Sequence, residues 1–120
     1  MSEKLEKAVD AIISKTEKGQ ISWNRIDANI LKNNPFYKQY MSENYMELDL
    51  INNYVAPYNG GYIYFTNQTF SDYREIAIQP KENASITVLS TGRSVKLKML
   101  EENIKNELDN PDEFIESIID

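Results

Sequence analysis

The side chains available for chemistry in this chain are carboxylates, lysines, tyrosines and hydroxyls, because the sequence contains no histidine and no cysteine. Without histidine, a Ser-His-Asp triad cannot form, and the usual general base at neutral pH is missing. Without cysteine, disulfides, thiolate zinc sites, iron–sulfur clusters and cysteine nucleophiles are excluded. Carboxylates such as Glu101 and Glu102 are adjacent on a predicted helix, so they do not face one another as a hydrolase pair would. We therefore expect a protein that is not an enzyme and carries no cofactor or metal.

Two smaller groups of polar residues are candidates for ligand sites. Asp109, Asp112 and Glu113 offer oxygen ligands, but their spacing does not match a calcium-binding loop. Arg93 and Lys96 lie at the start of a predicted helix, where backbone amides can hold a phosphate. No glycine-rich loop precedes them, so the sequence does not favour a phosphate site.

Negative charge is concentrated at the C-terminal end of the chain. The net charge is −6, and residues 101–120 contribute −7 of it, so residues 1–100 sum to +1. Such a segment repels phosphate, which disfavours direct nucleic-acid binding. It could instead dock on a basic protein or imitate a phosphate backbone, or its acids could simply keep a helix pair soluble. We predict Glu101, Glu102 and Glu113 as partner-binding residues on this acidic face.

Tyrosine is the second signal, with eight residues in 120. Tyr54, Tyr58, Tyr62 and Tyr64 gather around one predicted hairpin, and Tyr62 and Tyr64 alternate with Ile63 and Phe65. If helices cover the Ile63 face, the opposite face is an exposed aromatic strip, and tyrosine is enriched at protein interfaces. The alternative is ordinary cross-strand packing. We predict these four tyrosines as partner-binding residues; base stacking is disfavoured because basic flanks are missing.

The helical elements are marked by spacing and by capping residues. Apolar residues at helical spacing predict a helix over residues 2–18, ended by Gly19. The extended stretch 20–23 is either a short edge strand or a segment that brings Trp23 onto the core. Asn34-Pro35 predicts a helix start, with the helix near 35–49, although alternation from Met46 also favours a strand. Helices are also predicted over 94–109 and from Asn110-Pro111 onward.

Between these helices the apolar period is two. Strands are expected at 53–58 and 61–65, joined by Asn59-Gly60, which is a strong hairpin signal. Further strands are expected at 73–79, and at 85–90 with Ile86 and Val88 facing inward. The predicted fold class is therefore α+β. An antiparallel sheet of about three to five strands in meander order carries the N-terminal and C-terminal helices on one face.

The chain is expected to form one domain over 1–120. No apolar run approaches the length of a membrane span, so we expect no membrane contact and a cytoplasmic location. The run from Lys15 to Trp23 (KTEKGQISW), placed after an amphipathic helix, resembles a recurring opening in small uncharacterised proteins of Firmicutes, their phages and mobile elements. The run from Tyr54 to Tyr64 and the two terminal helices resemble that group as well. The resemblance supports the fold and implies no activity.

Taken together, these features favour a small acidic, non-enzymatic protein-binding module of a bacterium or its mobile element. An inhibitor, an immunity protein or an adaptor would be consistent with this hypothesis. The alternative is a small-molecule-binding or weakly enzymatic module that uses tyrosine and carboxylates.

Overall fold

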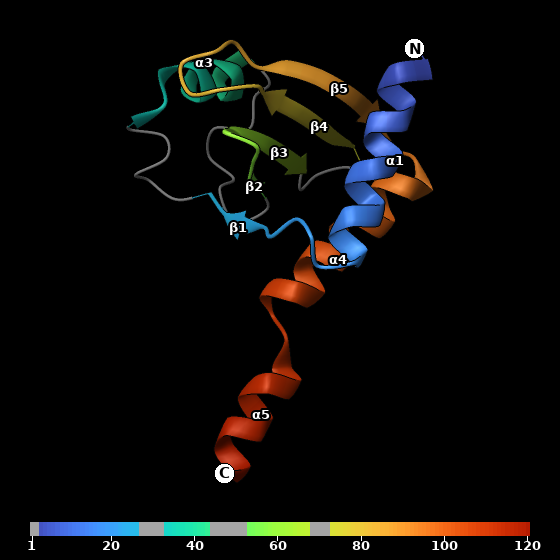
Figure 1. Cartoon of the computed structure of the whole chain (residues 1–120), viewed down its shortest axis with the longest axis vertical. Helices are drawn as coiled ribbons and strands as arrows, with labels where there is room; N and C mark the ends of the chain where they lie inside the picture. The colour runs from blue at the N-terminus through green and yellow to red at the C-terminus, as the bar shows by residue number, and fades with distance from the viewer. Residues whose placement is uncertain (1–2, 27–32, 44–52, 68–72) are drawn as a thin grey trace.

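A meander of five antiparallel strands, in the order β1-β2-β3-β4-β5, forms the centre of the molecule, and helices lie on both of its faces (Figure 1). The computed structural model describes residues 3–26, 33–43, 53–67 and 73–120. The elements in chain order are α1 (Glu3–Glu17), β1 (Asn24–Arg25), α3 (Pro35–Glu43), β2 (Asn53–Tyr58), β3 (Gly61–Asn67), β4 (Arg74–Gln79), β5 (Thr87–Gly92), α4 (Val95–Leu108) and α5 (Pro111–Ile119).

Helix α1 ends at the glycine that the sequence predicts. Gly19 has a φ of +71°, a left-handed conformation that costs glycine little. Its N–H donates to the Thr16 carbonyl oxygen at 3.1 Å, and the N–H of Gln20 donates to the Lys15 carbonyl oxygen at 2.8 Å. This is a Schellman motif, which satisfies the last carbonyls of the helix and turns the chain toward the sheet.

The segment after this turn places Trp23 in the core, as one reading of the sequence predicts. The Trp23 side chain is buried, and its indole Nε1–H donates to Thr16 Oγ1 at 3.0 Å. The Thr16 hydroxyl in turn donates to the Ile12 carbonyl oxygen at 2.8 Å. The indole therefore loses no hydrogen bond on burial. Strand β1 follows directly and pairs with β2 at one edge of the sheet.

The Asn59-Gly60 hairpin is confirmed. Both turn residues have positive φ, 47° and 81°, as a two-residue type I′ turn requires. Gly61 opens β3 opposite Tyr58, and a Cβ at Gly61 would lie 2.4 Å from the Gln79 carbonyl oxygen. Only glycine allows β3 and the end of β4 to approach this closely.

The orientation of β5 differs from the sequence prediction. Val88 was expected to face inward, but its side chain is 39% exposed, whereas Leu89 is 5% exposed and lies in the main core. Ile86 packs against the cluster on the opposite face of the sheet. The reason is a register shift between Ile76 and Ala77 of β4, which inserts an extra residue in β5 and reverses its alternation.

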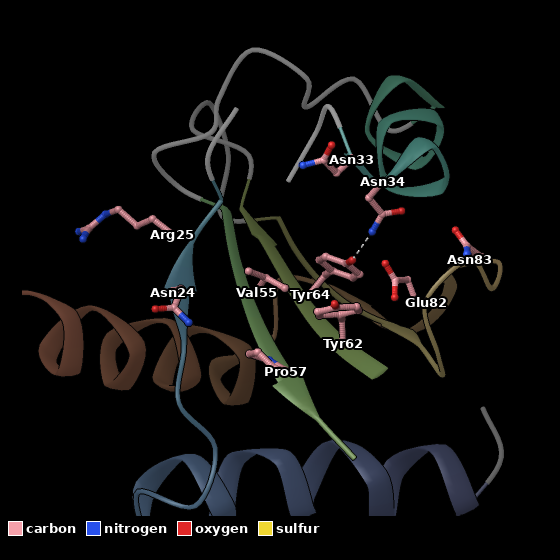
Figure 2. Close-up of a pocket in the computed structure, with 10 residues that line it drawn as sticks. All are labelled: Asn24, Arg25, Asn33, Asn34, Val55, Pro57, Tyr62, Tyr64, Glu82 and Asn83. Carbon is pink, nitrogen blue, oxygen red and sulfur yellow. Dashed lines mark hydrogen bonds between the residues drawn. The ribbon is translucent and has the colours of Figure 1, made fainter. Parts of the chain in front are cut away.

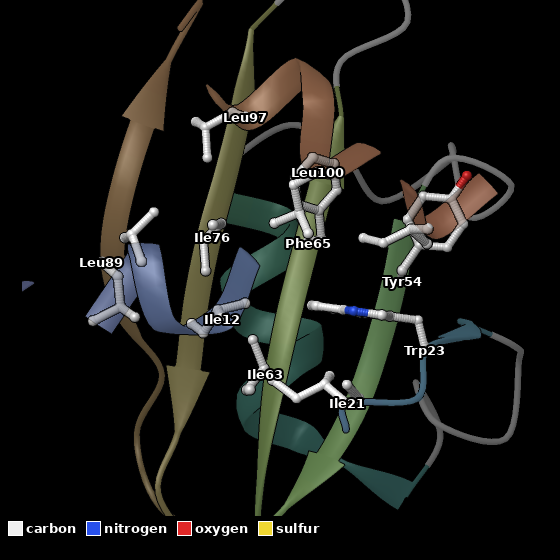
Figure 3. Close-up of a cluster of buried hydrophobic side chains, with 13 residues drawn as sticks. Ile12, Ile21, Trp23, Tyr54, Ile63, Phe65, Ile76, Leu89, Leu97 and Leu100 are labelled. Carbon is white, nitrogen blue, oxygen red and sulfur yellow. The ribbon is translucent and has the colours of Figure 1, made fainter. Parts of the chain in front are cut away.

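The main core fills the face of the sheet that α1 and α4 cover, as Figure 3 shows. These two helices lie on the same face, so this part of the predicted fold class is confirmed. The buried cluster consists of Val9, Ile12, Ile21, Trp23, Tyr54, Ala56, Ile63, Phe65, Ile76, Leu89, Leu97, Leu100 and Ile104. Nearly all of its members are apolar, so its stability comes from area removed from water.

The opposite face of the sheet is covered by α3, which begins as predicted at Asn34-Pro35. The Asn34 side-chain oxygen accepts the Tyr37 backbone N–H at 3.1 Å, which makes Asn34 the N-cap. The second cluster comprises Ile26, Tyr37, Tyr40, Val55, Tyr64 and Ala77. Helix α3 is described as far as Glu43, and the predicted continuation to residue 49, like the alternative strand from Met46, falls outside the described residues.

Within the described part of the chain, no helix combines the length and the apolar character needed to cross a bilayer.

Candidate functional site

Helix α5 carries most of the large apolar side chains that the described residues leave exposed. Phe114, Ile115, Ile118 and Ile119 are 49–77% exposed, and no residue of α5 is buried. Figure 1 shows α5 extending away from the sheet and from the other helices. Its start is well defined, because Pro111 occupies the first turn and Asn110 Oδ1 accepts the Asp112 N–H at 3.1 Å.

The two faces of α5 differ sharply in chemistry. At 3.6 residues per turn, Phe114 and Ile118 form one i, i+4 pair, and Ile115 and Ile119 form another beside it. The four acids of residues 111–120 fall on the other side of the helix: Asp112, Glu113, Glu116 and Asp120. The result is an unpartnered apolar stripe with an acidic back, which we call the α5 stripe.

The acidic residues predicted as one surface are divided by the structure. Glu102 and Glu113 are exposed, whereas Glu101 is buried beneath α4 and does not belong to the acidic surface. Its Oε1 accepts from Arg74 Nη2 at 2.9 Å, and its Oε2 accepts from the Asn67 side-chain amide. Lys105 Nζ lies 4.0 Å from Oε1. The sequence held a signal for this, because Glu101 lies on the apolar stripe of α4 and Arg74 shares a face with Ile76.

The four hairpin tyrosines are likewise divided between environments. Tyr54 is buried in the main core, and Tyr58 packs partly against that same cluster. Tyr62 and Tyr64 do share the other face, as predicted, but this face is not an open aromatic strip because α3 covers it. Tyr64 is 1% exposed and stacks on Tyr37 with ring centroids 4.5 Å apart. Tyr58 and Tyr62 keep partial exposure.

A closed hydrogen-bond network joins the start of α3 to strands β3 and β4. The Tyr64 hydroxyl donates to Gln79 Oε1 at 2.7 Å, and Asn34 Nδ2 donates to both of these oxygens, at 2.8 and 2.9 Å. Gln79 Nε2 donates to the Ala84 carbonyl oxygen at 2.9 Å and to Asn34 Oδ1 at 3.3 Å. Both amides thus use both of their hydrogens and their oxygen, which fixes their orientation.

A cavity of about 560 Å³ opens in front of this network, between β1, the start of α3 and the turn after β4 (Figure 2). This volume lies within the range of small-molecule sites. The lining residues among those described are Asn24, Arg25, Asn33, Asn34, Val55, Pro57, Tyr62, Tyr64, Glu82 and Asn83. Sequence reasoning missed this cavity, because its lining comes from short segments far apart in the chain.

The side chains of Tyr37, Tyr40 and Tyr64 are buried between α3 and the sheet. Tyr40 donates its hydroxyl to the carboxylate of Glu75, which is itself buried. The Tyr37 hydroxyl is buried and has no hydrogen-bond partner among the described residues. Burial raises the pKa of Tyr37, Tyr40 and Tyr64 above the ordinary phenol value, and the Glu75 carboxylate raises that of Tyr40 further.

Three of the other polar candidates of the sequence, Arg93, Lys96 and Asp109, contact other side chains. The Arg93 guanidinium lies over the Tyr73 ring, 5.6 Å from its centroid, and Lys96 Nζ is 2.5 Å from Asp10 Oδ1. Asp109 accepts from Arg25 at 2.7 Å, and this contact raises the pKa of Arg25. In residues 3–26, 33–43, 53–67 and 73–120, no group of three or more acidic side chains is placed to hold a metal ion.

Comparison with protein-family models, with curated proteins and with solved structures finds no match for this chain.

Proposed function

We propose that this protein is a non-enzymatic protein-binding module and that it holds its partner through the α5 stripe. The observation that carries this proposal is that Phe114, Ile115, Ile118 and Ile119 stand exposed on a helix that extends from the body. Exposed large apolar side chains that are contiguous mark interaction sites far more often than scattered ones do. The i, i+4 pairing of the stripe matches the way amphipathic helices insert into grooves.

The chemistry of α5 also describes the partner. The stripe consists of two i, i+4 pairs of side chains, so a flat contact against it would bury too little area for a stable complex. A partner that surrounds the stripe with an apolar groove overcomes this. The acids at Asp112, Glu113 and Glu116 border the stripe without any basic residue between them, so the groove should be edged by lysine or arginine.

Two other kinds of partner, a second copy of the chain and a membrane surface, fit the α5 stripe less well. Pairing of two α5 helices from two copies of the chain would bring six carboxylates together with no base in either helix. An anionic membrane surface would meet the same acids, whereas surface-binding helices usually carry lysine and arginine on their polar face. Inhibitors, immunity proteins and adaptors all act through contacts of the kind proposed.

The test places a photo-crosslinking residue at Ile115 in one variant and at Glu116 in another. These neighbours lie on the apolar and acidic sides of the same helix. The partner captured at position 115 is then purified, and its affinity is measured for the parent, for Phe114→Ala with Ile118→Ala, and for Met99→Ala. Met99 is an exposed apolar residue on α4 and serves as the matched control.

We expect the double variant to weaken binding by roughly a hundredfold, since buried anchors of this size each contribute more than about 1 kcal/mol. Met99→Ala should bind like the parent, and added salt should slow association. The proposal fails if the double variant binds like the parent, or if position 115 crosslinks only to a second copy of the chain and the parent sediments as a dimer.

A further inference from the structure

The cavity in front of Tyr64 has a wall that is already complete. Asn34, Tyr64 and Gln79 satisfy one another, so the back of the cavity holds its shape without a ligand. Preorganisation of this kind lowers the entropy that binding must overcome. The floor consists of apolar surface from Val55 and Pro57 beside the partly exposed ring of Tyr62.

The rim of the cavity has the opposite character. Asn24, Asn33 and Asn83 come from three separate segments, and Glu82 joins them from the turn after β4. Among the described residues, none of these four side chains makes a hydrogen bond or an ion pair, and Asn24, Asn33, Glu82 and Asn83 are all exposed. The rim therefore offers three free amides, each with donors and an acceptor, together with a carboxylate that accepts only.

The charge of the cavity excludes an anionic ligand. Arg25 is the one cation among the lining residues described, and its guanidinium is engaged by Asp109 at 2.7 Å. Figure 2 shows Arg25 extending away from the tyrosines, whereas Glu82 extends toward Tyr64 and Asn34. A phosphate or carboxylate in this cavity would meet the Glu82 carboxylate without a counter-ion.

We infer that this cavity binds a neutral saccharide. A sugar ring has an apolar C–H face for the floor of Tyr62, Val55 and Pro57, and hydroxyls around its edge. A hydroxyl both donates and accepts, so it satisfies an amide in either orientation and donates to the Glu82 carboxylate. The cavity is large enough for a ring of this kind. This site is independent of the α5 stripe, because no residue of α5 lines it.

The experiment follows the side-chain amide NMR signals of Asn24, Asn33 and Asn83 in the full-length, isotope-labelled protein. Neutral hexoses, N-acetylhexosamines and their disaccharides are titrated to millimolar concentration in one arm. Uncharged nucleosides form a second arm, because they also present a ring with hydroxyls. The phosphate esters of the same hexoses form a third.

We expect at least one neutral saccharide to shift these amide signals saturably and its phosphate ester to bind more weakly. Two single variants at exposed positions then test the contacts, and each has a matched single-variant control on α4. Asn24→Ala is compared with Asn106→Ala, and Glu82→Gln is compared with Glu102→Gln. Loss of a neutral hydrogen bond predicts roughly threefold to tenfold weaker binding for Asn24→Ala. Glu82→Gln keeps an acceptor oxygen but replaces a charged hydrogen bond by a neutral one, which also predicts roughly threefold to tenfold weaker binding.

The inference is overturned if no saccharide of the panel moves these signals, if only nucleosides do, or if a phosphate ester binds more tightly than its neutral parent. Equal weakening by Asn24→Ala and Asn106→Ala would overturn it as well. Because all four substitutions are at exposed positions, a folding defect is not expected, and the amide spectrum itself reports whether each variant is folded.

Discussion

The two faces of the sheet are stabilised in different ways. On the α1 and α4 face, aliphatic and aromatic side chains fill the core, and the one buried ion pair described there joins Arg74 to Glu101. On the α3 face, tyrosines dominate, and the hydroxyls of Tyr64 and Tyr40 are hydrogen-bonded to amides and to a carboxylate. The first face depends on close packing of apolar side chains. The second depends on hydrogen bonds made by tyrosine hydroxyls, which must stay protonated.

The difference also bears on the cavity, which lies on the α3 face. Tyr64 and Gln79 form a polar wall whose groups are hydrogen-bonded to one another and to Asn34 beside the open space. The contrast between the two faces leads to the following predictions, which run from the largest expected effect on stability to the smallest.

Alkaline pH should disrupt the α3 face and with it the fold. The pKa values of Tyr37, Tyr40 and Tyr64 are raised above that of an unfolded phenol, about 10. The contribution of these phenols to the free energy of unfolding is complete below pH ~10. It is lost as the pH rises further, because only the unfolded chain then releases the phenol protons. Each phenol lowers the free energy of unfolding by about 1.4 kcal/mol per pH unit. Circular dichroism should be lost above pH ~10 together with the appearance of the phenolate absorbance that comes from the buried tyrosines.

Tyr37→Phe supplies the control for this titration. It removes one phenol with a raised pKa, so above pH ~10 the free energy of unfolding should fall less steeply, by about 1.4 kcal/mol per pH unit. If the phenolate absorbance develops fully while circular dichroism stays constant, the three hydroxyls are not buried as described.

On the opposite face, the largest single-residue effect is expected at the ion pair. Glu101→Gln leaves the buried Arg74 guanidinium without its carboxylate and should cost about 4 kcal/mol of unfolding free energy. The exposed neighbour gives the matched control, since Glu102→Gln should change stability by less than about 0.5 kcal/mol. Urea unfolding measures both, and equal values for the two variants would contradict the buried pair.

A smaller contrast lies within the α3 face itself. Tyr64→Phe removes a hydroxyl that serves both Asn34 and Gln79, and should cost about 1–2 kcal/mol. Tyr37→Phe removes a buried hydroxyl that has no partner among the described residues, and should be neutral or slightly stabilising below pH ~9. Thermal unfolding of the two variants side by side checks this. Equal losses would mean that the Tyr37 hydroxyl is hydrogen-bonded after all.

The smallest effect on stability is expected outside both faces. Phe114→Ser combined with Ile118→Ser replaces two exposed side chains of α5 and should leave the free energy of unfolding within about 0.5 kcal/mol of the parent. By comparison, Leu100→Ala in the main core should cost about 3 kcal/mol. A loss of several kcal/mol in the α5 variant, measured by urea unfolding, would show that the stripe is covered by the body of the protein.

Local sequence signals predicted most of the elements correctly because each of them depends on a few neighbouring residues. Gly19 ends α1, Asn34-Pro35 and Asn110-Pro111 begin helices, and Asn59-Gly60 closes a hairpin, as their backbone preferences require. The same-face packing of α1 and α4 followed from their apolar stripes. These features need no information from distant parts of the chain.

Features that arise from contacts between distant segments were not predicted. The alternation of β5 depends on a bulge opposite Ile76 and Ala77, and both Val88 and Leu89 are apolar enough to face inward. The burial of Tyr64 depends on α3 covering the second face, and that of Glu101 on Arg74 lying beneath it. The cavity needs five short segments to meet, so no local pattern marks it.

Trp23 has a practical consequence for all of these measurements. It is the only tryptophan in the chain. Its ring packs edge-to-face on the Phe65 ring, with the ring centroids 6.5 Å apart, and its indole N–H is hydrogen-bonded to Thr16 of α1. Its fluorescence therefore reports on the junction of α1 with the sheet and on little else. Tyrosine signals come from both faces, since Tyr54 lies in the main core and Tyr64 lies on the α3 face. Comparing the tryptophan signal with the tyrosine signals of the unmodified protein shows whether the junction of α1 with the sheet unfolds in the same step as the rest of the molecule.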